Sequence, residues 1–258
     1  MNMIKTYKKC LWAIPLGLLL NIDCLSPEPA GSLEGDLNFF FLNSFLDVRT
    51  YEGAGRTVLL ISFMSMSAIL IFSLLCGMDI YKEMYSSGIY VITRVKSKKK
   101  WIMSLVMELA TKSFLFGLLY AIVTWLLELY YTGMKMDGRF VYAFILAVIF
   151  MCISVFLIAL IINYISICKN TRIGTFSGVS ILLVMIVYVL FYDKIPVLRD
   201  KDYLRYLDPI YICNLFYENS LIKTGFIFLY YFLVLLLIVF YFVKLVEKLD
   251  IKLLNEDI

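Results

Sequence analysis

Glu108 and Lys112 lie four residues apart inside a long apolar stretch, with the acid first. On a helix this order favours an ion pair, because side chains at i and i+4 are neighbours. Two hypotheses follow. Either the pair is mutually satisfied at the edge of a membrane, or it lines a pathway or a contact with another subunit, since ionisable groups in membrane helices often have functional roles.

The helix that must carry this pair is longer than a simple membrane crossing. The segment from Trp101 to Tyr131 would span about 46 Å as a helix at about 1.5 Å per residue, against about 30 Å of hydrocarbon. Its first third also carries polar residues that share one helical face: Ser104, Glu108, Thr111 and Lys112. We therefore expect the helix to begin at the inner interface and to cross the membrane from about Ser113.

A basic cluster precedes this helix. It comprises Arg94, Lys96, Lys98, Lys99 and Lys100, and Trp101 follows it directly. Each lysine gains on the order of 1 kcal/mol near an anionic inner leaflet, and tryptophan is enriched at the headgroup level. The sequence predicts that Lys98, Lys99, Lys100 and Trp101 anchor the chain at the inner leaflet.

The composition is that of a membrane protein. Of the 258 residues, 62% are hydrophobic and 17% are charged, whereas a soluble domain is about half apolar and a quarter charged. A soluble fold of this composition would expose large apolar patches that aggregate. The net charge of +4 is small and does not indicate a nucleic-acid partner.

Several kinds of chemistry have no support in the residues. The chain has no histidine and no C-x-x-C among its six cysteines, which removes the usual zinc sites and catalytic Cys/His pairs. It has no phosphate-binding G-x-x-x-x-G-K-[ST] loop, no H-E-x-x-H and no G-x-S-x-G. We therefore expect no catalytic, cofactor-binding or metal-binding residues, and an enzyme is disfavoured.

Six apolar segments are candidate membrane spans, giving an all-α fold with one transmembrane domain over residues 1–258. They are 10–22, 57–78, 101–131, 140–163, 176–192 and 224–243. The first is short and follows Lys5, Lys8 and Lys9, so a signal peptide is the rival interpretation. An uncleaved span is preferred, because no clean cleavage site follows it directly.

Loop charges orient these spans. With six spans both termini lie on one side, and that side receives the larger share of Lys and Arg. The segment 23–56, between the first two spans, has six acidic and two basic residues. Both termini and the loop 79–100 are therefore predicted to be cytoplasmic, in a multi-pass protein of a bacterial plasma membrane, and the segment 23–56 is predicted to lie outside.

The loop 79–100 begins with a short stretch of mixed charge and aromatic residues that can form a helix: Asp79, Ile80, Tyr81, Lys82, Glu83, Met84 and Tyr85. Ser86, Ser87 and Gly88 are expected to break that helix. Two hypotheses stay open for this loop. It sets the topology and does nothing more, or its short helix fits a groove of a soluble partner.

A resemblance bears on this choice. The stretch GIYVITRVKSKKKW, from Gly88 to Trp101, is similar to a pattern with Gly, Arg, Ser and Trp in some permeases of ABC-2-type transporters from Gram-positive bacteria, and Arg94, Ser97 and Trp101 are the matching positions. Asp208-Pro209, before the last span, resembles a break near Asn/Asp-Pro in the same family. The topology resembles that family over the whole chain, whereas the motifs cover about 20 residues.

The resemblance implies a membrane subunit that couples ATP hydrolysis on a separate chain to the movement of a cargo. The aromatic and apolar residues available to line a path suit a hydrophobic or amphipathic cargo. The residues it implies for ATPase coupling are Asp79, Tyr81, Lys82, Glu83, Tyr85 and Arg94. The implied partners are ABC ATPase subunits, which carry ATP and Mg, a second permease subunit that is identical or different, and the bilayer. Export of an antimicrobial peptide, or immunity against one, is the expected role.

An alternative comes from another class of protein. The segment 23–56 is acidic and aromatic, with Phe39, Phe40 and Phe41 in it, and is longer than a minimal permease needs. A non-transporting immunity or sensory protein could bind a peptide through this segment. Copurification with an ATPase discriminates the two.

Overall fold

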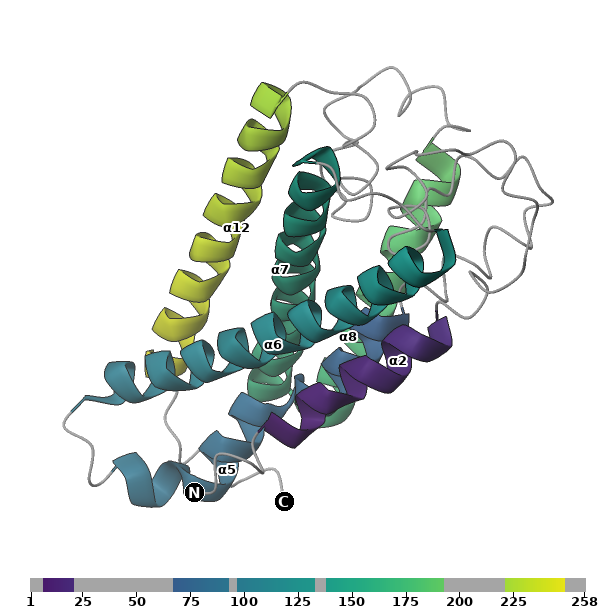
Figure 1. Cartoon of the computed structure of the whole chain (residues 1–258). Coiled ribbons are helices and arrows are strands. Elements are labelled where there is room, and N and C mark those ends of the chain that lie inside the picture. Colours follow the sequence, from purple (N-terminus) through teal and green to yellow (C-terminus); the bar gives the residue numbers. More distant parts are fainter. Residues whose placement is uncertain (1–6, 21–66, 93–96, 133–137, 193–220, 249–258) are drawn as a thin grey trace.

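The computed structural model describes residues 7–20, 67–92, 97–132, 138–192 and 221–248 (Figure 1). Every regular element in these ranges is helical, which confirms the all-α prediction. The elements are η1 (Lys8–Trp12), α2 (Ala13–Leu20), α5 (Asp79–Ile92), α6 (Lys98–Thr132), α7 (Gly138–Cys168), α8 (Thr171–Tyr192) and α12 (Leu221–Lys248). Residues 67–76 are also helical and lead into α5 through a turn at 77–78.

Three described helices are long and apolar enough to cross a membrane. The stretches that meet both conditions are Lys98–Leu127 in α6, Met151–Cys168 in α7 and Phe228–Val246 in α12. They fall on the predicted spans 101–131, 140–163 and 224–243. The predicted span 176–192 lies on α8, which contributes the shorter apolar stretch Thr171–Met185.

The first predicted span lies only in part within the described residues. The sequence predicts one membrane helix over residues 10–22. Its described part consists of the end of the five-residue 3-10 helix η1 and the eight-residue helix α2, and residues 21–22 lie outside the described residues. Pro15 lies in the first turn of α2, where a proline is tolerated, and thus favours a change from 3-10 to α-helix near Ala13. Figure 1 shows α2 alongside α6, against which it packs.

α6 is one continuous helix of 35 residues, or about 52 Å at about 1.5 Å per residue. It starts at Lys98, so the lysines assigned to the end of a loop over 79–100 belong to its first turn. Figure 1 shows α6 running obliquely across α7, while α7 and α12 run side by side in a different direction.

α7 lies at the centre of the packing and contacts α5, α6, α8 and α12. Gly117 of α6 makes one of these contacts close, since a Cβ there would lie 2.7 Å from the Cys152 Sγ of α7. Phe72 and Phe116, both fully buried, pack with ring centroids 4.8 Å apart and join the helix at 67–76 to α6. The helix at 67–76, α6 and α7 are thus held together by a dense apolar core.

α7 and α8 form a tight hairpin. α7 ends at Cys168, and Asn170 begins α8 by accepting the amide of Ile173 on its Oδ1 at 2.8 Å. This is N-capping by a side chain that satisfies an otherwise free helix donor. The turn brings α8 back along α7.

Candidate functional site

α5 starts after the turn at 77–78, and a side chain of α7 accepts one of the backbone amides in its first turn. The amide of Gly77 donates to the Ser73 carbonyl at 2.8 Å, and the amide of Lys82 donates to the Met78 carbonyl at 2.9 Å, as in a regular helix. The Tyr81 amide instead donates to Asn163 Oδ1 of α7 at 3.1 Å. Asn163 is fully buried and donates its own Nδ2 to the Ala159 carbonyl at 2.9 Å, which fixes its orientation.

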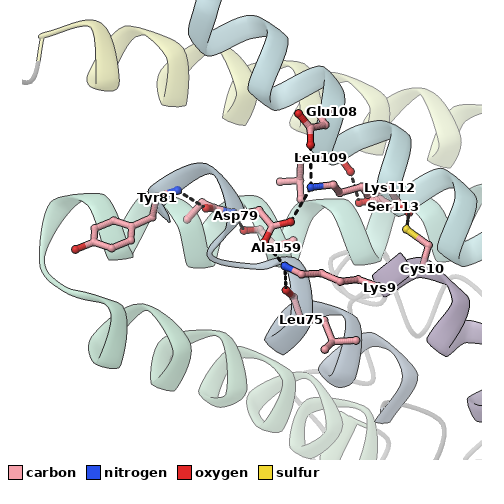
Figure 2. A network of polar contacts seen from close by, with 11 residues as sticks. Lys9, Cys10, Leu75, Asp79, Tyr81, Glu108, Leu109, Lys112, Ser113 and Ala159 are labelled. Carbon is pink, nitrogen blue, oxygen red and sulfur yellow. Dashed lines mark hydrogen bonds and ion pairs between the residues drawn. The ribbon is translucent and has the colours of Figure 1, made fainter. Parts of the chain in front are cut away.

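Asp79, in the first turn of α5, binds two lysines from two other elements (Figure 2). Its Oδ1 pairs with Lys9 Nζ of η1 at 2.5 Å, and its Oδ2 pairs with Lys112 Nζ of α6 at 2.7 Å. Lys9 also donates to the Leu75 carbonyl at 2.8 Å, at the end of the preceding helix. The carboxylate is further favoured by its place at a helix N-terminus, where the backbone dipole is positive.

The predicted pair of Glu108 and Lys112 is present. Lys112 Nζ lies 3.0 Å from Glu108 Oε1 and therefore binds two carboxylates at once. The Lys112 side chain is only 7% exposed, whereas those of Asp79 and Glu108 are 16% and 31% exposed. We call Lys9, Asp79, Glu108 and Lys112 the Asp79 network.

The polar residues predicted to share one face of α6 do not all point the same way. Ser104 and Thr111 are exposed, and their hydroxyls donate to the carbonyls of Trp101 and Met107 on their own helix. Lys112 instead turns inward to Asp79. The prediction of one shared polar face is therefore wrong in part, because Lys112 has acidic partners inside the bundle.

A partly open pocket of about 240 Å³ lies over the network. Three lysines and three acids line it, together with one serine and three aliphatic side chains: Lys9, Asp79, Ile80, Lys82, Glu83, Ser86, Leu105, Glu108, Leu109 and Lys112. Equal numbers of positive and negative groups leave its wall with no net formal charge, so the pocket does not select a strongly charged ligand by attraction.

The residues expected to couple to an ATPase do not all lie on one surface. Lys82 and Tyr85 are exposed, Tyr81 and Glu83 are half-buried, and Asp79 faces the interior. The rings of Tyr81 and Tyr85 stack with centroids 6.1 Å apart and planes 16° apart.

Two further expectations concern the same stretch. The predicted break at Ser86, Ser87 and Gly88 is wrong, since α5 continues through them to Ile92. Local propensity against a helix amounts to only about 1 kcal/mol for a glycine, so flanking structure can outweigh it. Arg94 lies outside the described residues, as do the segments 23–56 and 57–66 and the Asp208-Pro209 motif.

The predicted anchoring residues lie in the first turn of α6. Ser97 begins the helix by accepting the Lys100 amide on its Oγ at 3.4 Å. Lys99 and Lys100 are exposed, and Lys98 and Trp101 are half-buried. Three lysines at the positive end of a helix dipole are unfavourable by a few tenths of a kcal/mol each, so a negatively charged surface facing them would remove that cost.

Sequence reasoning missed two members of the site. Lys9 was counted only as a charge flanking a span, and nothing in its spacing points to Asp79, 70 residues away. Asn163 had a usable signal, because it is an isolated amide in the apolar run of α7 and a polar group buried there needs a partner.

The chemistry available to this site is the making and breaking of ion pairs. Across the described ranges, no group of three or more His, Cys, Asp or Glu side chains is arranged to hold a metal ion. What the site does is join η1, α6 and α7 to the first turn of α5.

These features define a multi-pass, all-helical membrane protein with a polar joint at the start of a short helix. No protein-family model matches the chain, and no curated protein or solved structure is significantly similar to it.

Proposed function

We propose that this chain is the membrane subunit of an ATP-binding-cassette transporter, with six spans, both termini in the cytoplasm and the ATPase on a separate chain. Two such subunits, alike or different, would face each other in the bilayer. The cargo would be hydrophobic or amphipathic, with export of an antimicrobial peptide, or protection against one, as the biological role.

The observation that carries this proposal is the placement of α5. It is a 14-residue helix that follows a membrane-type apolar segment through a turn, and its sequence is more polar than those of α7 and α12. Its first turn is tied to three other elements by Lys9, Lys112 and Asn163. Its outer side offers Lys82 and Tyr85 to solvent. A helix that packs into the bundle on one side and exposes charged and aromatic side chains on the other is suited to contact a soluble partner.

The charges around α5 support a cytoplasmic placement. Figure 1 shows α5, the start of α6, the α7–α8 turn and the end of α12 toward the same end of the molecule. Described basic residues at this end are Lys82, Lys98, Lys99, Lys100, Lys169, Arg172 and Lys244. Positive charge gathers on the cytoplasmic side of membrane proteins.

Gentle detergent purification of the full chain from its native host, with mass spectrometry of the proteins that come with it, tests the proposal. A stoichiometric ABC-type ATPase is the expected result, and a second permease species would show a heteromeric assembly. Purification of the chain without any ATPase would overturn the proposal and favour the alternative of a peptide-binding immunity protein.

A further inference from the structure

α5 is held by polar contacts near its start, and its outer side is exposed further along. Asp79 is paired with Lys9 and Lys112, and the Tyr81 amide is bound by Asn163. Tyr85 is 38% exposed, about one and a half turns further along. Met84, next to it, is buried in the apolar core, so only the outer face of this part of α5 is open. A displacement that moves the start of α5 must break the contacts of Asp79.

The two lysines respond differently when Asp79 moves away. The Lys9 side chain is 38% exposed and can exchange the carboxylate for water. The Lys112 side chain is only 7% exposed, so far less water is at hand to replace the lost carboxylate. Losing one partner of a buried ion pair is costly chiefly because the other charge stays buried and uncompensated.

Glu108 removes that penalty. It lies one helical turn before Lys112 on the same helix and already pairs with it at 3.0 Å. Because both groups belong to α6, this pair stays intact when α5 shifts. Glu108 is thus a reserve partner: when Asp79 moves away, Lys112 still has one carboxylate to pair with.

We infer that the Asp79 network is a release device for α5. In one state Lys112 is shared between Asp79 and Glu108, and in the other Lys112 is paired with Glu108 alone while Lys9 faces water. The inference deepens the proposed function, on which it rests for the source of the push on α5. Glu108 is a positioning residue in this device, because it acts on α5 through Lys112.

The device makes two substitutions act in opposite directions. Asp79→Asn removes the charge that holds α5, so the start of α5 opens more often. Glu108→Gln removes the reserve partner, so Lys112 depends on Asp79 and α5 opens less often. If the network only stabilised the fold, both variants would open α5 more often.

Hydrogen–deuterium exchange of the full chain in lipid nanodiscs, followed by mass spectrometry of peptides that cover α5, measures this opening. We expect exchange at Ile80 to Glu83 to be several-fold faster in Asp79→Asn and several-fold slower in Glu108→Gln than in the wild-type chain. Faster exchange in both variants, or no change in either, would overturn the inference.

Two further variants keep the result interpretable. Glu108→Asp keeps a carboxylate, so its α5 amides are expected to exchange at the wild-type rate. A rate like that of Glu108→Gln would show that the charge of residue 108 is not the cause and would overturn the inference. Thr111→Val changes an exposed side chain next to Lys112 that bonds only its own helix, and it is expected to leave α5 unchanged.

The measurement needs no ATPase, so the two proposals can fail separately. Opposite exchange effects in a chain that copurifies with no ATPase would keep the release device and reject the transporter. A copurifying ATPase with parallel exchange effects would keep the transporter and reject the device.

Discussion

The side chain of Asn163, fully buried on α7, accepts the backbone amide of Tyr81 on α5. The distance is 3.1 Å, and the donor is an amide that would bond the Gly77 carbonyl if the helix at 67–76 ran on without a turn. A single side chain thus allows the chain to bend at 77–78 without leaving a buried donor unsatisfied. The bend at 77–78 therefore depends on the side-chain amide of Asn163.

Replacing Asn163 with Leu should destabilise the chain by about 1 to 3 kcal/mol, because the Tyr81 amide loses its acceptor in a buried place. Denaturation in mixed micelles measures the loss in the free energy of unfolding. Ser154→Ala, a small polar change at a buried site on the same helix, is the control and should cost less. Equal losses in the two variants would argue that the amide finds another acceptor.

Lys9→Ala and Lys112→Ala should differ in cost although both lysines bind Asp79. Lys9 is partly exposed, and losing it leaves Asp79 paired with Lys112, so the cost should be about 1 kcal/mol or less. Lys112 is buried between two acids and its loss removes two ion pairs at once, so the cost should be larger, about 1 to 3 kcal/mol. The same denaturation assay compares them. A larger effect for Lys9 would contradict the difference in burial between the two lysines.

Tyr85→Glu should uncouple a partner ATPase while leaving membrane insertion intact. The ring is exposed and stacked on Tyr81, so a charge there changes the surface of α5 without burying an acid. The readouts are ATP hydrolysis by the copurified complex and protection or transport in cells. Tyr81→Glu should act in the same way, with an added loss of stability since Tyr81 is half-buried.

Tyr130→Glu is the matched control, since Tyr130 is an exposed tyrosine toward the far end of α6. It should leave coupling unchanged. Wild-type coupling in both α5 variants would show that α5 is not the contact with the ATPase.

Gly117→Ala should destabilise the crossing of α6 and α7 by about 1 to 3 kcal/mol through overpacking. The new Cβ would lie 2.7 Å from Cys152 Sγ. Because that atom ends a short side chain, Cys152→Ala should restore much of the loss in the double variant. Thermal unfolding in detergent measures all three variants. Additive losses would mean that the backbone of Cys152, and not its sulfur, sets the approach.

Cys168 reports the orientation of the membrane helices. It is exposed at the end of α7, while Cys10 and Cys76 are buried and Cys152 is half-buried. In a variant with Cys24 and Cys213 changed to serine, a membrane-impermeant thiol reagent should label Cys168 in inside-out vesicles and not in intact cells. Labelling in intact cells would reverse the predicted topology.

Local patterns predicted the helices well and their contacts poorly. Long apolar runs identified α6, α7, α8 and α12, because the length and hydrophobicity of a span are properties of a continuous segment. The spacing of Glu108 and Lys112 predicted their ion pair for the same reason, as both lie on one helix.

Contacts between distant segments left no such pattern. The resemblance implied a role in ATPase coupling for Asp79, and no pattern indicated the two lysines that it binds, which are 70 and 33 positions away. The start of α6 at Lys98 and the continuity of α5 through Gly88 were also missed. Gly88 has a weak helix propensity and the lysines at the start of α6 have an unfavourable charge there. In both cases the rest of the helix stabilises the helical conformation of these residues.

The length of α6 relates the Asp79 network to the thickness of the membrane. About 20 residues run from Ser113 to Thr132, or about 30 Å of helix, which matches the hydrocarbon depth of a typical bilayer. With the crossing predicted to start at about Ser113, Glu108 and Lys112 would lie at the boundary where hydrocarbon gives way to headgroups. In a thicker bilayer the pairs around Asp79 would be drawn toward a medium of lower dielectric constant, in which attraction between opposite charges grows. Reconstitution in lipids of increasing acyl-chain length should therefore hold α5 more firmly, which would make this joint sensitive to the lipid composition of the cell.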